Sequence, residues 1–187
     1  MMPSPLRIAF AGLAHSHPFT DAHNARGLGA EVVAVCDADA GAATDFANRF
    51  GARVVGSPAA LITHRPDVLV ATPRPDEVVP LLRDLAQSGA VAPVFFNKVV
   101  AATDAQLTAW ESALGGVRAP VGTASVLRFA PALARLADDL AEQDIIGVRV
   151  HAQHDNAGFQ LPGRAWQDDP VQGGGTLVTV GVHAWEM

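Results

Sequence analysis

The chain has 187 residues, of which 49% are hydrophobic, and it carries a formal net charge of −6 at pH 7. This composition favours a packed core over disorder, and the acidic balance argues against a nucleic-acid-binding surface. One cysteine excludes an internal disulfide framework. The lack of a signal-peptide pattern and of an apolar run of about 18 residues then predicts a cytoplasmic protein without membrane spans.

Short apolar runs alternate with longer helical stretches over the first 120 residues, as in a parallel sheet with crossover helices. The runs predict strands at 6–11, 31–36, 53–55, 67–71 and 94–96. The stretches between them predict helices at 20–28, 40–50, 75–88 and 103–114, and Ser57-Pro58 predicts the start of a brief helix. The pattern indicates a doubly wound α/β domain over residues 1–120.

The character of the sequence changes after Gly115-Gly116, and we place the domain boundary near residue 120. Beyond it, the pattern predicts a strand at 121–126, a helix at 131–142 and an alternating strand at 145–153 that belongs to a different sheet. A loop over 156–170 then leads to a terminal helix that follows three glycines. Residues 121–187 are therefore expected to form an incomplete α+β domain.

The turn after the first strand reads Gly12-Leu13-Ala14-His15-Ser16-His17, where a doubly wound sheet holds a pyrophosphate against a helix N-terminus. Only the first glycine of Gly-x-Gly-x-x-Gly is present, and a histidine in the third place would crowd the phosphates or the strand–helix packing. Asp37 ends the second strand at the spacing of a ribose partner, although it could equally cap the next helix. We expect cofactor contacts here, with a plain tight turn as the alternative.

Lys98, His183 and Thr179 are the candidate catalytic residues. Lys98 lies at the carboxyl end of an apolar strand, where open α/β sheets bind ligands, and could polarise a substrate oxygen. A surface lysine is the alternative. His183 lies in the terminal helix, four residues after Thr179 and three before Glu186, so the three could share one face. We expect His183 to transfer a proton, although a lone helix histidine is more often structural.

The early histidines also allow a metal-dependent hydrolase. His15 and His17 form a His-x-His pair at the end of a first strand, as in amidohydrolase barrels, and His151, His154 and Asp155 would have to supply further ligands. The chain is shorter than a barrel of about 250 residues. We therefore favour a nucleotide or substrate contact and expect no metal.

Six short motifs follow one another along the chain. They are the strand and turn Arg7–Gly12, the strand end Val35–Asp37, the loop Ala71-Thr72-Pro73, the segment Asn97–Ala101, the element Val126–Pro131 and the helix Gly173–His183. In this order they resemble the Gfo/Idh/MocA family, the relatives of glucose–fructose oxidoreductase and inositol dehydrogenase. The resemblance covers nearly the whole chain.

This resemblance implies a Rossmann-type domain that binds NAD, with NADP disfavoured by the acidic Asp37, and the start of a substrate and oligomerisation domain. It also implies a homo-oligomer in the full-length form. The loop at Thr72 and Pro73 would lie beside the nicotinamide ribose. The remaining implied site residues are Asn97 and Lys98 at the cofactor, and Lys98, Arg128 and His183 at the substrate.

The chain departs from the family pattern at several of these places. Asn97 stands in place of the glutamate of a Glu-Lys-Pro motif, and Val99 stands in place of its proline. Thr179 replaces the aspartate of the active-site helix, which removes a carboxylate from the implied catalytic set. Most of the second domain is absent, so we expect a C-terminally truncated member of the family.

We therefore expect an NAD(P)-dependent oxidoreductase that transfers a hydride between nicotinamide and a sugar, cyclitol or related polyol. A dinucleotide-binding sensor that has lost its chemistry is the first alternative, because of Thr179 and the imperfect turn. The metal-dependent hydrolase is the second alternative. Nucleic-acid and membrane partners are not expected.

Overall fold

The computed structural model describes residues 4–151, 153, 155, 157 and 161–185. Contacts within the chain separate it into two compact units, one that ends at Thr123 and one that begins at Ala124. Among the described residues, no helix combines the length and the apolar character that a membrane crossing requires.

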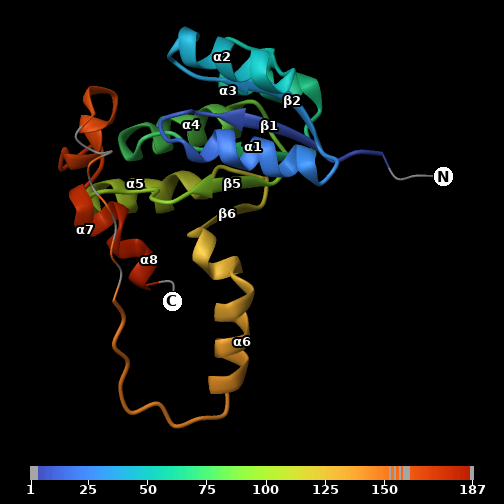
Figure 1. The fold of residues 1–187 in the computed structure, drawn as a ribbon. Coiled ribbons are helices and arrows are strands. Elements are labelled where there is room, and N and C mark those ends of the chain that lie inside the picture. The colour runs from blue at the N-terminus through green and yellow to red at the C-terminus, as the bar shows by residue number, and fades with distance from the viewer. Residues whose placement is uncertain (1–3, 152, 154, 156, 158–160, 186–187) are drawn as a thin grey trace. The chain divides into compact units, whose positions relative to one another are not determined.

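The first unit is built on a six-stranded sheet with the order β3-β2-β1-β4-β5-β6 (Figure 1). The strands are β1 (Arg7–Ala11), β2 (Glu31–Cys36), β3 (Arg53–Val54), β4 (Val68–Ala71), β5 (Val94–Asn97) and β6 (Val121–Ala124). β1 pairs in parallel with both β2 and β4, and β5 pairs in parallel with β4. The strand order therefore reverses next to β1, which creates a switch point at the carboxyl ends of β1 and β4.

Helices cover both faces of this sheet. They are α1 (His17–Gly27), α2 (Ala40–Phe50), α3 (Pro58–Leu61), α4 (Pro75–Gln87) and α5 (Asp104–Leu114), with a short 3-10 helix η1 (Ile62–His64). Alternate residues of β1 enter two separate cores: Ile8 and Phe10 pack with α1 and α2, and Ala9 and Ala11 pack with α3, α4 and α5. The predicted doubly wound α/β architecture is confirmed.

The predicted strands and helices of this unit agree with the structure to within a few residues. The largest difference is α1, which was predicted to begin at Thr20 and begins at His17 instead. Pro18 explains the early start, because proline is favoured in the first turn of a helix, where its missing N–H costs nothing. His17 is therefore the first helical residue rather than a turn residue.

The second unit consists of short helices joined by irregular segments. They are η2 (Val126–Phe129), α6 (Pro131–Leu140), η4 (Pro162–Asp168), α7 (Gly175–Thr179) and α8 (Gly181–Trp185). The strand predicted at 121–126 ends at Ala124, because Ser125 caps η2 by accepting the Leu127 N–H at 3.2 Å.

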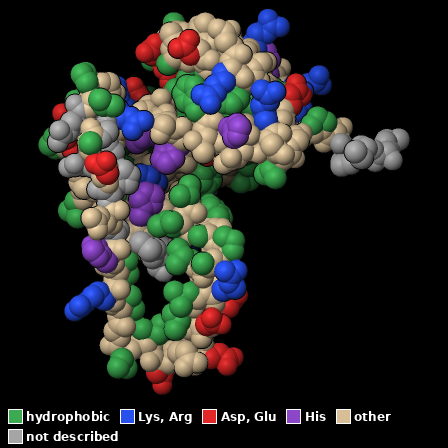
Figure 2. Space-filling model, in the orientation of Figure 1, with side chains coloured by type: hydrophobic (Ala, Val, Ile, Leu, Met, Phe, Trp, Pro, Cys, Tyr) green, Lys and Arg blue, Asp and Glu red, His purple; other side chains and the backbone are tan. Residues whose placement is uncertain are grey.

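The strand predicted at 145–153 is wrong for the residues that the structure describes. Residues 145–151 and 153 have no regular secondary structure, and Ile146 and Val148 are exposed. A strand requires a partner to pair with, and alternation of apolar residues does not supply one. Figure 2 shows hydrophobic side chains exposed along α6 and the segment that follows it.

The single terminal helix that we expected is also wrong. α7 ends at Thr179 and α8 begins at Gly181, so the helical run is interrupted at Val180. The Thr179 hydroxyl donates to the Gly175 carbonyl at 2.9 Å, a back-bonding contact that perturbs a helix. Thr179 and His183 therefore belong to different helices.

Candidate functional site

The turn after β1 is pressed against the end of β4. Gly12 adopts a φ of +82°, and a Cβ at this position would lie 2.7 Å from Pro73 N and 2.9 Å from the Thr72 carbonyl carbon. Only glycine meets both demands, because it tolerates positive φ and has no side chain. The first glycine of the degraded motif is thus required by the close approach of two strand ends.

The backbone amides of this turn are held by the neighbouring strand ends. Gly12 N donates to the Cys36 carbonyl at 2.8 Å, and Ala14 N donates to the Thr72 carbonyl at 3.2 Å. Leu13 N donates to the Asp37 carboxylate. The amides that follow belong to the start of α1, so an anion at this edge would meet the positive end of the α1 dipole.

His15, Ser16 and His17 lie at the start of α1. Ser16 is the N-cap residue, and its hydroxyl makes no capping hydrogen bond within the described part of the chain. The rings of His15 and His17 lie 5.6 Å apart, centroid to centroid. His17 is only partly buried and lies outside the apolar cores, so the predicted crowding of the strand–helix packing is not found.

Asp37 connects the end of β2 to the turn after β1. Its Oδ2 accepts from Leu13 N, and its Oδ1 accepts from Asp39 N at 2.7 Å. Asp39, not Asp37, caps α2, since its carboxylate accepts from the first amides of that helix. The alternative role of Asp37 as a helix cap is therefore excluded. Each carboxylate oxygen has lone pairs left for a further donor, such as a ribose hydroxyl.

A buried polar network lies at the carboxyl ends of β4 and β5. Thr72 is 1% exposed and Asn97 is 8% exposed, although both are polar. Asn97 Nδ2 donates to Thr72 Oγ1 at 2.9 Å and to Asp21 Oδ2 at 3.1 Å. The sequence predicted Thr72 and Asn97 as site residues but missed Asp21. A single aspartate within a helix belongs to no motif, so nothing local in the sequence marks it.

Lys98 follows β5 directly, next to this network. Burial lowers its pKa from the ordinary value of 10.5, because the ammonium group is partly removed from water. A lysine in this state can stabilise a negative oxygen when it is charged and is easier to deprotonate than a surface lysine. Lys98 is therefore partly buried and not a fully solvated surface lysine.

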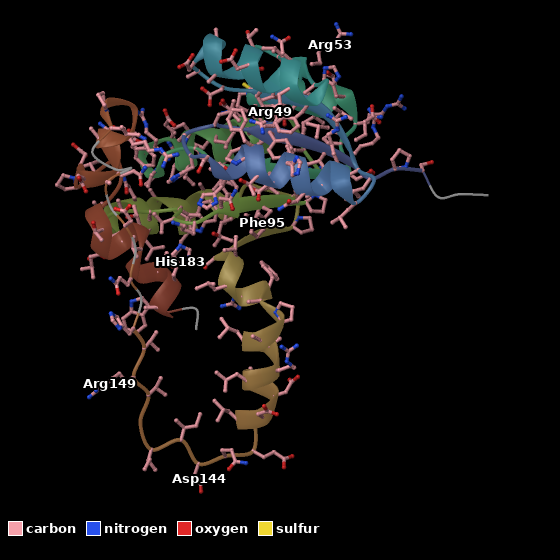
Figure 3. The ribbon with its side chains drawn as sticks, viewed as in Figure 1. Arg49, Arg53, Phe95, Asp144, Arg149 and His183 are labelled. Carbon is pink, nitrogen blue, oxygen red and sulfur yellow. The ribbon has the colours of Figure 1, made fainter. Side chains whose placement is uncertain are left out.

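In the second unit, α8 carries His183 (Figure 3), and the imidazole of His183 contacts a buried serine. Ser125 Oγ lies 2.6 Å from His183 Nδ1, and Ser125 is fully buried. Glu186, which the sequence places three residues after His183, lies outside the described residues. The sequence analysis missed Ser125 because this residue lies 58 residues before His183 and within the segment 121–126 that was predicted as a strand.

Gly173, the first of the three glycines, is explained by packing within the second unit. A Cβ at Gly173 would collide with the backbone of Gln167 in η4. The close approach that Gly173 allows is therefore to another segment of the chain, whereas a Cβ at Gly175, the first residue of α7, would meet nothing within 4 Å. Arg128, the other substrate residue predicted here, is exposed on η2.

The described part of the chain offers no geometric support for the metal-dependent hydrolase. No group of three or more His, Cys, Asp or Glu residues that could hold a metal ion is present there. His151 and Asp155 do not form such a group with His15 and His17, and His154 lies outside the described residues.

Comparisons with known proteins give structural matches only: no family model and no curated protein matches the chain. It is similar to a provisionally assigned myo-inositol dehydrogenase from Sinorhizobium meliloti 1021, with a TM-score of 0.72, 20% identity, and coverage of 95% of this chain and 52% of that one. The WlbA dehydrogenase of Thermus thermophilus, solved with NAD and UDP-GlcNAcA, gives a TM-score of 0.65, 19% identity, and coverage of 97% and 62%.

Biliverdin reductase from Synechocystis sp. PCC 6803, solved with biliverdin and NADP+, gives a TM-score of 0.56, 18% identity, and coverage of 80% and 46%. The chain thus spans between 46% and 62% of the length of these three structures. Sequence identities of 18% to 20% establish the fold alone. The Rossmann-type α/β fold is therefore confirmed, and the activity is a separate question.

Proposed function

We propose that this chain carries the cofactor-binding unit and the start of the substrate domain of a Gfo/Idh/MocA-type oxidoreductase that acts on a sugar, cyclitol or related polyol. The observation that carries the proposal is the placement of Lys98, with its lowered pKa, beside the buried Thr72–Asn97 pair at the carboxyl edge of the sheet. Ligands bind at this edge in open α/β folds.

The residues of this edge fit a nicotinamide dinucleotide. The turn from Gly12 to His17 and the α1 N-terminus suit a pyrophosphate, and the Asp37 carboxylate suits a ribose diol. Thr72, Pro73 and Asn97 offer polar contacts for the nicotinamide half. The negative charge of Asp37 would repel the 2′-phosphate of NADP, so NAD is the expected cofactor. When bound, the nicotinamide supplies the acceptor or donor of the hydride.

The proton of the substrate hydroxyl would pass to His183. In the tautomer that carries its hydrogen on Nδ1 and donates it to Ser125 Oγ, Nε2 would be the atom that takes the proton. In the first unit, the Lys98 ammonium would stabilise a substrate oxygen that loses its proton, and the hydride would leave from the carbon that bears this oxygen. Serine cannot become an anion, so it stabilises the imidazolium less than a carboxylate would.

A panel of sugars and cyclitols, mixed with NAD+ and the chain, tests this function through the absorbance of the reduced nicotinamide. We expect turnover with at least one polyol, and His183→Gln should lower kcat about 10²-fold because the proton acceptor is lost. His23→Gln, on the exposed side of α1, is the matched control and should leave kcat unchanged. Equal rates for His183→Gln and wild type would exclude His183 from proton transfer.

A dinucleotide-binding sensor without turnover is the second candidate. Thr179 favours it, because the hydroxyl that stands in place of a carboxylate is buried and donates to Gly175. The two candidates differ in one measurable respect. The sensor would bind NADH but would reduce NAD+ with no member of the polyol panel.

A further inference from the structure

Asp21 is the carboxylate that faces the buried end of β5. It lies in the second turn of α1, and its Oδ2 is 3.1 Å from Asn97 Nδ2. The second proton of the same amide is directed to Thr72 Oγ1, 2.9 Å away. Both donors of the Asn97 amide are therefore used by two acceptors that come from different elements of the fold.

These contacts determine which way the Asn97 amide faces. A carboxylate can only accept hydrogen bonds, so a flipped amide would place its oxygen against the Asp21 oxygen and lose the bond. With the nitrogen held by Asp21 and Thr72, Oδ1 is kept as the acceptor atom of the side chain.

The same network joins the two halves of the candidate cofactor edge. α1 begins at the turn that would face the pyrophosphate, and Asp21 lies four residues after its first residue. Thr72 accepts from Asn97 through its side chain and from Ala14 N through its carbonyl. A change at Asp21 would therefore be transmitted to the β4 end, the β5 end and the turn together.

We propose that Asp21 is a positioning residue of the dinucleotide site. Asp21 would hold the Asn97 amide so that Asn97 Oδ1 accepts from a hydroxyl or amide donor on the nicotinamide half of the dinucleotide. This inference rests on the proposed function. It adds that the carboxylate next to the end of β5 stands on α1, and that residue 97 itself is an amide. A second carboxylate at residue 97 would face the first in a mostly buried position.

Exchange of the two groups tests the proposal on the full 187-residue chain. NADH binding would be titrated by nicotinamide fluorescence, with thermal unfolding recorded alongside, for wild type, Asn97→Glu and the double variant Asp21→Asn/Asn97→Glu. Asn97→Glu should weaken NADH binding more than about tenfold at pH 7, because two carboxylates that face each other in a mostly buried position repel.

The double variant restores one carboxylate and one amide, so it should bind NADH within about threefold of wild type. Asp21→Ala, which leaves an amide proton without its acceptor, should weaken binding about tenfold, whereas Asp21→Asn keeps an acceptor oxygen and should weaken it less. Asp45→Asn and Asn48→Glu make the same changes on the exposed side of α2 and should have no effect.

The outcomes separate this inference from the proposed function. If wild type fails to bind NADH, the proposed function fails and the inference fails with it. If wild type binds NADH and a folded Asn97→Glu or Asp21→Ala variant binds it equally well, the inference alone is overturned. If Asn97→Glu does not fold at pH 7, the NADH affinities of Asp21→Ala and Asp21→Asn are compared instead. Weaker binding by Asp21→Ala than by Asp21→Asn supports the inference, and equal binding overturns it.

Discussion

Replacement of Lys98 by Met is expected to lower kcat roughly 10³-fold while NADH affinity stays within about threefold of wild type. The methionine has a similar length and no charge, so it removes the stabilisation of the developing oxyanion but fills the same space. Lys98 is the only lysine of the chain. Arg118→Met removes an exposed positive charge elsewhere and should leave kcat unchanged.

Stability provides an independent check on Lys98. Burial lowers the Lys98 pKa below 10.5, so the unfolded chain binds this proton more tightly than the folded protein does. The free energy of unfolding therefore rises with pH between the folded-state pKa and 10.5, and the cost of burying the ammonium is present at lower pH. Lys98→Met should be at least as stable as wild type at pH 7, with a difference that shrinks as the pH approaches 10.5.

Two results would contradict this assignment of Lys98. Unchanged turnover in Lys98→Met would show that Lys98 has no role in the reaction. A large loss of NADH binding together with a lower melting temperature would instead indicate that Lys98 holds the fold or the cofactor, not the substrate oxygen.

Gly12→Ala should lower the free energy of unfolding by about 3 kcal/mol and weaken NADH binding more than about tenfold. The new Cβ would lie 2.7 Å from Pro73 N in a backbone conformation with a φ of +82°. To relieve this contact, the turn must move away from the β4 end, and the Leu13–Asp37 and Ala14–Thr72 hydrogen bonds would be distorted.

Gly29 is the matched control for Gly12. Its φ is +88°, but a Cβ there would have no neighbour within 4 Å. Gly29→Ala should therefore cost about 1 kcal/mol, for the backbone conformation alone, and should leave NADH binding unchanged. Equal losses of stability and of binding in the two variants would show that the close approach at Gly12 is unimportant.

The parts of the fold that were predictable are those that depend on local chemistry. β2 and α2 were predicted with their observed ends, because α2 is closed by Gly51 in the left-handed conformation and starts from a capping aspartate. The strand at 145–153 failed because pairing depends on residues elsewhere in a sheet. The terminal helix failed because a local hydroxyl contact at Thr179 competes with helical geometry.

The candidate site divides in the same way. Gly12, Asp37 and Lys98 were predictable, since each lies at a strand end where parallel sheets bind ligands. Asp21 and Ser125 were not, because their partners are 76 and 58 residues away in the sequence and no motif connects them. Asp21 also gives a physical reason for an amide at position 97: the amide satisfies the carboxylate next to it, whereas a glutamate would repel that carboxylate.

Titration of the purified chain with NADH and with NADPH would show whether the carboxyl edge of β1, β2, β4 and β5 binds a nicotinamide dinucleotide. We predict NADH binding in the micromolar range, with NADPH at least about tenfold weaker because of Asp37. Asp37→Asn should reduce that preference. A folded chain that binds neither nucleotide would contradict the account.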